Sequence, residues 1–155
     1  MISVKDVMTR DVITFREDTP VGELAETLHR KHITGAPVVD GDDHVVGIVS
    51  EVDVITKKGD VARDIMSSNV ISVTEDTGLE EAARILSGER IRRLPVMKQG
   101  KMVGLLSRSD VLEVFALRQW TCGTCGNRMH GLGSPDRCSH CGGHNFHLET
   151  ADPGP

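Results

Sequence analysis

The sequence contains an internal repeat that covers most of its 155 residues. When the chain is shifted by 58 positions, segment 4–40 aligns with segment 62–98, and 13 of these 37 positions carry the same residue. Unrelated chains of ordinary composition would share roughly two. After one residue is dropped from a turn, Gly47–Asp53 aligns with Gly104–Asp110. Such a repeat restricts the chain to architectures built from two similar units that pack on each other.

Each copy has the pattern strand, helix, strand, strand, helix. The first helix places apolar residues at i, i+3, i+4 and i+7, within segments 21–28 and 79–86. Thr19 and Thr77 are expected as the N-caps of these helices, and Pro20 suits the first helical position. The strands are expected at 12–15, 36–39 and 44–49 in the first copy and at 70–73, 94–97 and 101–106 in the second, with the second helices starting at Ser50 and Ser107.

The fold class that follows is α/β (α+β), with two βαββα units packed as a pseudo-twofold pair. Units of about 50 residues are too small to bury an adequate core alone. We expect the first unit at 1–58 and the second at 59–117. The remaining segment, 118–155, holds seven of the 16 glycines, four of the seven histidines and almost no aliphatic residues. Such a composition needs a metal to fold, so we expect a small metal-stabilised β domain at 118–150 and a disordered tail at 151–155.

All four cysteines lie in this last segment, as two Cys-x-x-Cys pairs. The sequence begins without the apolar stretch of a signal peptide, so we expect a cytoplasmic protein whose thiols stay reduced. Two thiolates three residues apart can hold one metal from a tight turn. The glycine after each pair should permit that turn and direct its N–H at a sulfur. Four thiolates suit Zn²⁺ or iron in a closed, non-catalytic site. The expected metal ligands are Cys122, Cys125, Cys138 and Cys141, with a histidine from among His140, His144 and His147 as the alternative to one cysteine.

Two Ser-x-x-Asp sequences open the predicted second helices, at Ser50–Asp53 and Ser107–Asp110. As capping boxes they satisfy the first N–H groups of a helix. Each also follows a buried strand, and a helix N-terminus in that position offers N–H groups and positive potential to a phosphate. The same residues can therefore cap the empty helix and contact a bound nucleotide.

The two copies resemble a tandem pair of cystathionine-β-synthase (CBS) domains. The match rests on Val7-Met8, Val12-Ile-Thr14, Gly35-Ala-Pro-Val38 and Gly47–Asp53, and in the second copy on Ile65-Met66, Val70-Ile-Ser72, Arg93-Leu-Pro-Val96 and Gly104–Asp110. The resemblance covers 1–117 and implies a regulatory module that binds AMP, ADP, ATP or S-adenosylmethionine in clefts between the copies and assembles as a homodimer. The last segment resembles a zinc ribbon or a rubredoxin-like knuckle pair.

The CBS resemblance implies ribose contacts from the two aspartates and ribose or phosphate contacts from the two serines of these boxes. Arg93, with help from Arg92, is expected to hold phosphate, because a guanidinium forks well onto phosphate. The first copy has Gly35 in place of this arginine, so the two clefts should differ. The full set of expected ligand-binding residues is Thr14, Thr34, Ala36, Ser50, Asp53, Ser72, Arg92, Arg93, Ser107 and Asp110.

Three functions fit the sequence. The first is a nucleotide-sensing regulatory protein whose ribbon contacts an unknown protein partner. The second is a rubredoxin-like iron protein whose redox role is regulated by the CBS pair. The third is a nucleic-acid binder that acts through its ribbon. Residues 118–155 carry three arginines against three acids, and the whole chain has a net charge of −5. Nucleic-acid binding needs excess positive charge, so this function ranks last.

Other functions are disfavoured. No apolar run approaches the ~18 residues that a membrane span requires. No nucleophile–base pair, open metal site or Walker-type phosphate loop is visible, so we do not expect an enzyme. The homodimer is expected to use apolar residues on the second helix of each copy: Val54, Ile55, Val111 and Val114.

Overall fold

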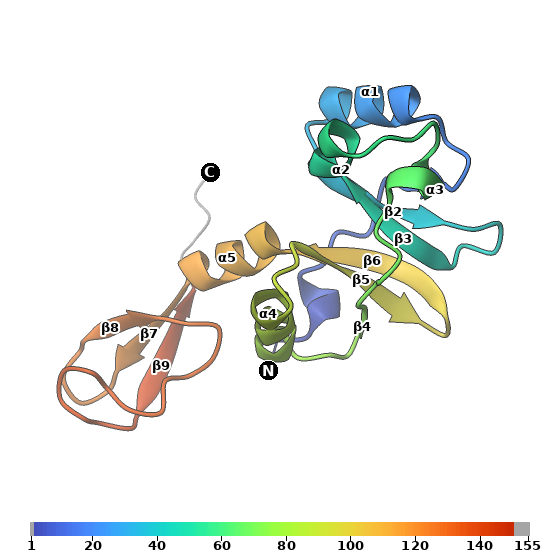
Figure 1. Cartoon of the computed structure of the whole chain (residues 1–155). Helices are drawn as coiled ribbons and strands as arrows, with labels where there is room; N and C mark the ends of the chain where they lie inside the picture. Colours follow the sequence, from blue (N-terminus) through green and yellow to red (C-terminus); the bar gives the residue numbers. More distant parts are fainter. Residues whose placement is uncertain (1, 151–155) are drawn as a thin grey trace. The chain divides into compact units, whose positions relative to one another are not determined.

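The computed structural model describes residues 2–150, so the expected disordered tail at 151–155 lies outside the described residues (Figure 1). The first repeat comprises the 3-10 helix η1 (Val4–Asp6), β1 (Phe15–Arg16), α1 (Val21–Lys31), β2 (Gly35–Val39), β3 (Val45–Ser50) and α2 (Glu51–Thr56). The second comprises α3 (Ala62–Ile65), β4 (Val73–Thr74), α4 (Leu79–Gly88), β5 (Arg93–Lys98), β6 (Lys101–Ser107) and α5 (Arg108–Leu117). The ribbon segment comprises β7 (Arg118–Cys122), β8 (Arg128–His130) and β9 (Phe146–Thr150).

Each repeat builds a three-stranded sheet, in the orders β1-β2-β3 and β4-β5-β6. The first strand of each sheet pairs in parallel with the second, and β2 and β3 form an antiparallel hairpin. In the first repeat, α1 and α2 lie side by side over the sheet (Figure 1). The mixed α/β class and the βαββα order predicted from the sequence are confirmed.

The first strand of each repeat is shorter than predicted. β1 pairs with β2 only at Phe15 and Arg16, and β4 pairs with β5 only at Val73 and Thr74. The predictions at 12–15 and 70–73 are therefore wrong over most of their length. β-branched residues favour extended backbone, but a strand also needs a partner for its hydrogen bonds, which local sequence does not supply.

The predicted N-caps of α1 and α4 are wrong by one residue. The N-cap of α1 is Pro20, which was expected inside the helix, and the N-cap of α4 is Gly78. Thr19 lies in the preceding turn, where its Oγ1 accepts a hydrogen bond from the Arg16 N–H at 3.0 Å. Neither helix start has a side-chain cap, so other backbone groups must satisfy its N–H donors.

Those backbone groups come from the opposite repeat. The Val21 N–H donates to the Asp60 carbonyl at 2.9 Å, and the Ala62 N–H donates to the Thr19 carbonyl at 2.9 Å. The second repeat has the same two bonds with the partners exchanged, from Leu79 to Ile2 and from Val4 to Thr77. The segment that opens each repeat, at η1 or α3, is therefore hydrogen-bonded to the start of the first helix of the other repeat.

This exchange explains how the chain divides into compact units. Among the described residues, one unit contains residues 2–8 together with Asp76–Arg93 and residues 106–150, and the other contains Thr9–Glu75 with Leu94–Leu105. The units therefore cross the predicted boundary between 58 and 59. The predicted domain limits describe the repeat in the sequence rather than these units, and they stay a prediction.

The cores of the repeats are aliphatic. In the second unit, α1, the first sheet and α3 bury one cluster: Phe15, Leu24, Leu28, Ala36, Val38, Val49, Ala62 and Ile65. In the first unit, Val4, Leu79, Ala82 and Leu106 are buried. The ribbon differs, because from Arg118 to Glu149 only Cys122 and Cys138 are buried. Within residues 2–150, no helix is long and apolar enough to cross a membrane.

Candidate functional site

The four cysteines form one cluster in the ribbon. Cys122 ends β7, and the other three lie in the loops between the ribbon strands. Every cysteine sulfur lies within 4.8 Å of the other three. The Cys122 and Cys141 sulfurs are 3.6 Å apart, and those of Cys125 and Cys138 are 3.7 Å apart. The predicted ligand set is therefore brought together, and each close contact joins one Cys-x-x-Cys pair to the other.

Each Cys-x-x-Cys pair lies in a turn of the same kind. The Gly126 N–H donates to the Cys122 carbonyl at 2.9 Å, and the Gly142 N–H donates to the Cys138 carbonyl at the same distance. Both glycines have left-handed backbone, with φ of 79° and 78°. The turn was predicted correctly, but the expected N–H bond to sulfur was assigned to the wrong residue. The donors to sulfur are the residues at other positions of the turn, such as Gly143, whose N–H lies 3.4 Å from the Cys141 sulfur.

The sulfur positions fit a tetrahedral metal. Metal–sulfur bonds of ~2.3 Å place the four sulfurs of a tetrahedron about 3.8 Å apart, close to the two observed separations. A disulfide needs about 2.05 Å, and all four cysteines are free thiols. The cluster of donors contains the cysteines alone, and the His144 Nδ1 lies 2.8 Å from the Asp136 carbonyl oxygen instead. Four soft ligands leave no open position, so this arrangement suits a structural or electron-transfer metal rather than a hydrolytic one.

Backbone N–H groups shift the pKa values of these thiols. The Cys141 N–H lowers the pKa of Cys138 to about 6, and the Cys125 N–H lowers the pKa of Cys122. The Gly143 N–H favours the Cys141 thiolate, but the neighbouring thiol of Cys125 and burial outweigh it and raise the pKa of Cys141 to about 12. Several thiolates this close repel one another, and a bound cation removes that repulsion.

The two Ser-x-x-Asp boxes form as predicted. Ser50 is the N-cap of α2, where its N–H donates to Asp53 Oδ2 at 2.8 Å and its Oγ accepts from the Asp53 N–H at 3.3 Å. Ser107 is the N-cap of α5, with matching distances of 2.9 and 3.2 Å to Asp110. Both boxes are half-buried. Each aspartate is therefore held at a helix N-terminus immediately after a partly buried strand.

In each repeat, one backbone hydrogen bond joins the first residue of the second helix to the residue just before a strand, β2 or β5. The Glu51 N–H donates to the Thr34 carbonyl at 2.9 Å, and the Arg108 N–H donates to the Arg92 carbonyl at 3.1 Å. The residue after that carbonyl is Gly35 in the first repeat and Arg93 in the second. The backbone of Arg92, with Arg93 next to it, thus lies at the helix start that Ser107 caps.

The surroundings of the two aspartates differ. Asp53 Oδ1 pairs with the Lys57 ammonium at 2.8 Å, one turn along α2. Val114 occupies the matching position of α5, so no cation at that position competes for Asp110. The Ser107 hydroxyl also lies 2.8 Å from the Ser109 hydroxyl, whereas the Ser50 hydroxyl donates to Asp53. The second box is therefore the more available acceptor.

The remaining predicted residues are spread more widely. Thr14 is exposed and lines a cavity of about 220 Å³ with Arg10 and Lys101, whose lining includes neither Ser50 nor Asp53. Ala36 is 1% exposed and belongs to the core, so its side chain is held within the protein. Ser72 is exposed and directly precedes β4. Thr14 therefore lies away from the first capping box.

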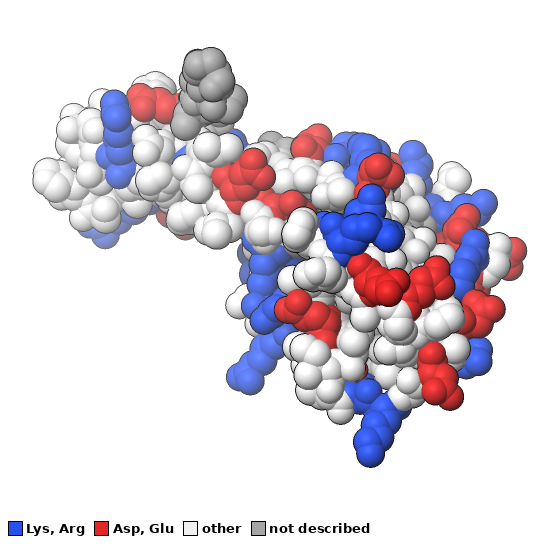
Figure 2. Space-filling model, turned by 90° about the horizontal axis from the view of Figure 1, so that it is seen from above, with Lys and Arg blue, Asp and Glu red and all other residues white. Residues whose placement is uncertain are grey.

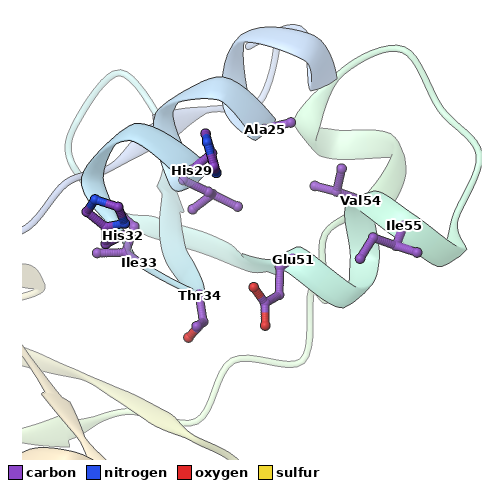
Figure 3. A pocket seen from close by; sticks show the side chains of 9 residues that line it. Ala25, His29, His32, Ile33, Thr34, Glu51, Val54 and Ile55 are labelled. Atoms are coloured by element: carbon purple, nitrogen blue, oxygen red, sulfur yellow. The ribbon is translucent and has the colours of Figure 1, made fainter.

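Thr34 lines a groove that the sequence did not reveal. The groove lies between α1 and α2 and encloses about 390 Å³. Figure 3 shows His29 and His32 along one side, Val54 and Ile55 along the other, and Thr34 and Glu51 below them. Of its apolar lining, Ala25 and Leu28 belong to the apolar face predicted for the first helix, and Val54 and Ile55 belong to the second helix. The sequence pointed to Val54 and Ile55 as apolar surface residues, but it gave no sign that the two helices leave a groove between them.

Comparisons with known proteins account for the repeats. Residues 4–59 and 62–117 each match the family described as CBS domain. The crystal structure of CBSX2 in complex with AMP has a TM-score of 0.70 and 33% identity, and the match covers 73% of this chain and 95% of that chain. The CBS domain pair of protein MJ0100, in complex with 5-methylthioadenosine and S-adenosylmethionine, has a TM-score of 0.71 and 27% identity, covering 75% and 97%.

Curated relatives include enzymes that are much longer. Inosine-5'-monophosphate dehydrogenase of Methanocaldococcus jannaschii is 34% identical over 111 residues, which is 70% of this chain but 22% of the relative. Homoserine O-acetyltransferase of Methanohalobium evestigatum is 32% identical over 116 residues, or 72% and 24%. The chain thus spans less than a quarter of either enzyme, and the ribbon from residue 118 onward lies outside the family match. Domain pairs of this kind are regulatory modules, and this chain belongs to the CBS domain family.

Proposed function

We propose that this protein is a nucleotide-sensing regulator rather than an enzyme. Its CBS pair binds an adenine nucleotide or S-adenosylmethionine, and its metal-bound ribbon contacts a protein partner in the cytoplasm, where thiols stay available for metal. The observation that carries the proposal is the repeated capping box, which holds an aspartate at a helix start next to a partly buried strand in both repeats. Similar CBS pairs have been crystallised with AMP and with S-adenosylmethionine.

The second repeat is the better candidate for tight binding. Asp110 can accept from ribose hydroxyls, Ser107 can reach ribose or phosphate, and Arg93 can hold phosphate at the same helix start. In the first repeat, Lys57 already pairs with Asp53, and Gly35 supplies no guanidinium. Both differences weaken the first site for a phosphorylated ligand relative to the second.

Calorimetric titration tests this assignment. AMP, ADP, ATP and S-adenosylmethionine are titrated into the wild type and into the matched variants Asp53→Ala and Asp110→Ala. We expect at least one ligand to bind the wild type and the Asp110 variant to lose more affinity than the Asp53 variant. A wild type that binds none of the four would refute the nucleotide role, and the boxes would then be helix caps alone.

We propose zinc as the resident metal, held by Cys122, Cys125, Cys138 and Cys141, where it would stabilise the ribbon. The sulfur separations fit iron equally well, so a rubredoxin-like redox protein regulated by the CBS pair is the second candidate. Elemental analysis of the purified protein separates the two, together with a visible spectrum. Ferric tetrathiolate absorbs visible light and a zinc site does not. A coloured, iron-containing sample would favour the redox role.

Nucleic-acid binding through the ribbon remains the third candidate and receives little support. On the face shown in Figure 2, lysines and arginines alternate with acidic residues instead of gathering in one patch. Arg128 is paired across the ribbon sheet with Glu149 at 3.7 Å. Four thiolates around one dication also carry about −2, which opposes phosphate.

We also propose a homodimer that covers the exposed apolar side chains of the second helices. The side chains most exposed differ in part from those predicted. Of the four predicted residues, Ile55 is 80% exposed, but Val54, Val111 and Val114 are half-buried. The other exposed apolar side chains of these helices include Val52, Leu112 and Phe115, at 55%, 65% and 43% exposure. The exposed apolar side chains on each helix, and the groove beside α2, each suit contact with a second copy. Light scattering that reports a particle of 16.9 kDa at micromolar concentration would contradict the dimer.

A further inference from the structure

The helix α5 belongs to the proposed nucleotide site at one end and to the metal-bearing ribbon at the other. It begins directly after Ser107, and it ends at Leu117 with Arg118 already in β7. Cys122, the first metal ligand, closes that same strand. No loop separates the helix from the strand, as the orange segment of Figure 1 shows. A change in the ribbon therefore acts on α5 without a flexible joint between them.

Side-chain contacts fix this junction. The Phe115 ring, in the last turns of α5, stacks on the His130 ring of β8 with centroids 5.9 Å apart and planes 25° apart. The Arg118 guanidinium donates to the Leu132 carbonyl at 3.2 Å and lies 5.5 Å from the centre of the Trp120 ring. The end of the helix is thus held by the ribbon segment that follows the first cysteine pair.

α5 depends on such support. It has ten residues, and none of them is buried. Isolated helices of this length are marginal in water, so tertiary contacts must supply most of its stability. The helix α2, which carries the equivalent capping box, has six residues and ends without a ribbon. The residues of α5 that contact the ribbon lie after its sixth residue, in the part that has no counterpart in α2.

The ribbon in turn depends on its cysteine cluster, because Cys122 and Cys138 are its only buried residues between Arg118 and Glu149. We propose that metal binding at the four cysteines and nucleotide binding at Ser107 and Asp110 are thermodynamically coupled through α5. Metal orders the ribbon, the ribbon holds the end of α5, and α5 presents its N-terminus to the ligand. By linkage, the nucleotide must strengthen metal binding by the same factor. The first repeat lacks this connection and stays uncoupled.

The test measures AMP affinity in zinc-loaded and EDTA-stripped protein. The Asp53→Ala variant reports on the second repeat and the Asp110→Ala variant on the first. In the Asp53→Ala background we expect stripping to weaken AMP about fivefold to tenfold, the lower part of the usual range for coupled sites. In the Asp110→Ala background we expect no change. Equal AMP affinity with and without zinc in the Asp53→Ala protein would overturn the coupling.

A junction variant identifies the route. Adding Phe115→Ala to Asp53→Ala should abolish the zinc dependence, whereas Glu113→Ala, an exposed residue of the same helix, should preserve it. Zinc dependence that survives in the Phe115 variant would remove α5 as the connection.

Amide exchange supplies a readout that needs no nucleotide. Stripping zinc should speed exchange along α5 but not along α2. The coupling inference rests on the proposed nucleotide role, and this measurement separates their failures. If none of AMP, ADP, ATP and S-adenosylmethionine binds the zinc-loaded wild type, the nucleotide role fails, and unchanged exchange in α5 on stripping defeats the coupling itself.

Discussion

The repeats and the ribbon are held together by different physical means. The first repeat, together with α3, buries a continuous apolar cluster, while the described ribbon buries only two cysteines. Apolar burial contributes about 25 cal/mol for each Å² removed from water, so the repeats can stabilise themselves. The ribbon has almost no such area to bury, so the metal that we propose at its four cysteines would supply its stability. The comparison teaches that a short chain can hold one part by packing and another by coordination, and that the two parts respond to different perturbations.

Metal removal is expected to have the largest effect, and to act on the ribbon and the helix α5 that joins it. Structural zinc contributes about 10–16 kcal/mol of binding energy in small zinc domains, and this energy is folding energy. EDTA should therefore unfold 118–150 while the repeats stay folded, with the end of α5 loosened. Amide exchange resolved along the chain measures both parts. Protection in β7 that survives complete removal of metal would show that the ribbon has a core of its own.

A cavity in a repeat should have the next largest effect, and it should destabilise the repeats while leaving the ribbon unchanged. Leu94 on β5 is fully buried, and Leu94→Ala should cost about 2–5 kcal/mol of unfolding free energy because a buried side chain leaves a void. The control is Leu148→Ala on β9, which is 41% exposed and should change stability by less than about 0.5 kcal/mol. Zinc content should equal that of the wild type in both variants. Comparable losses from the two substitutions would contradict the division into packed repeats and a coordinated ribbon.

Asp110→Ala should change ligand recognition without changing metal content. It removes a charged acceptor worth roughly 1.5–3 kcal/mol, so AMP affinity should fall about tenfold to a hundredfold. It also removes a helix cap, which should cost about 0.5–1 kcal/mol of stability without ligand. Calorimetry and thermal unfolding separate the two effects. A loss of stability with unaltered AMP affinity would leave Asp110 with a structural role only.

Arg93→Ala should have the smallest effect and the most selective one. Arg93 is half-buried, so its phosphate contact is partly screened, and AMP should bind about fivefold to tenfold more weakly. Adenosine has no phosphate and should bind as it does to the wild type. Titration of both ligands into both proteins decides the matter. An equal loss for adenosine and AMP would exclude Arg93 from the phosphate role.

Local patterns predicted the features that depend on residues close in sequence. Ser50 and Ser107 cap their helices as expected, because the box needs only residues three apart and a free helix N-terminus. The failures occurred where a distant partner decides the outcome. Val12–Thr14 have strand residues but no strand partner, and Thr19 precedes the cap because Ala62 from the other repeat donates to its carbonyl.

The sequence by itself determined that the chain has two similar αβ units, where their capping boxes lie and which four sulfurs act as a set, because these depend on spacing along the chain. Tertiary structure alone decided two other features. Opening turns are exchanged between the repeats, and Phe115 meets His130 at the junction of α5 with the ribbon. The reason is physical. Spacing fixes which backbone groups lie within one turn, whereas a hydrogen bond, ion pair or ring contact between distant segments depends on how the whole chain packs.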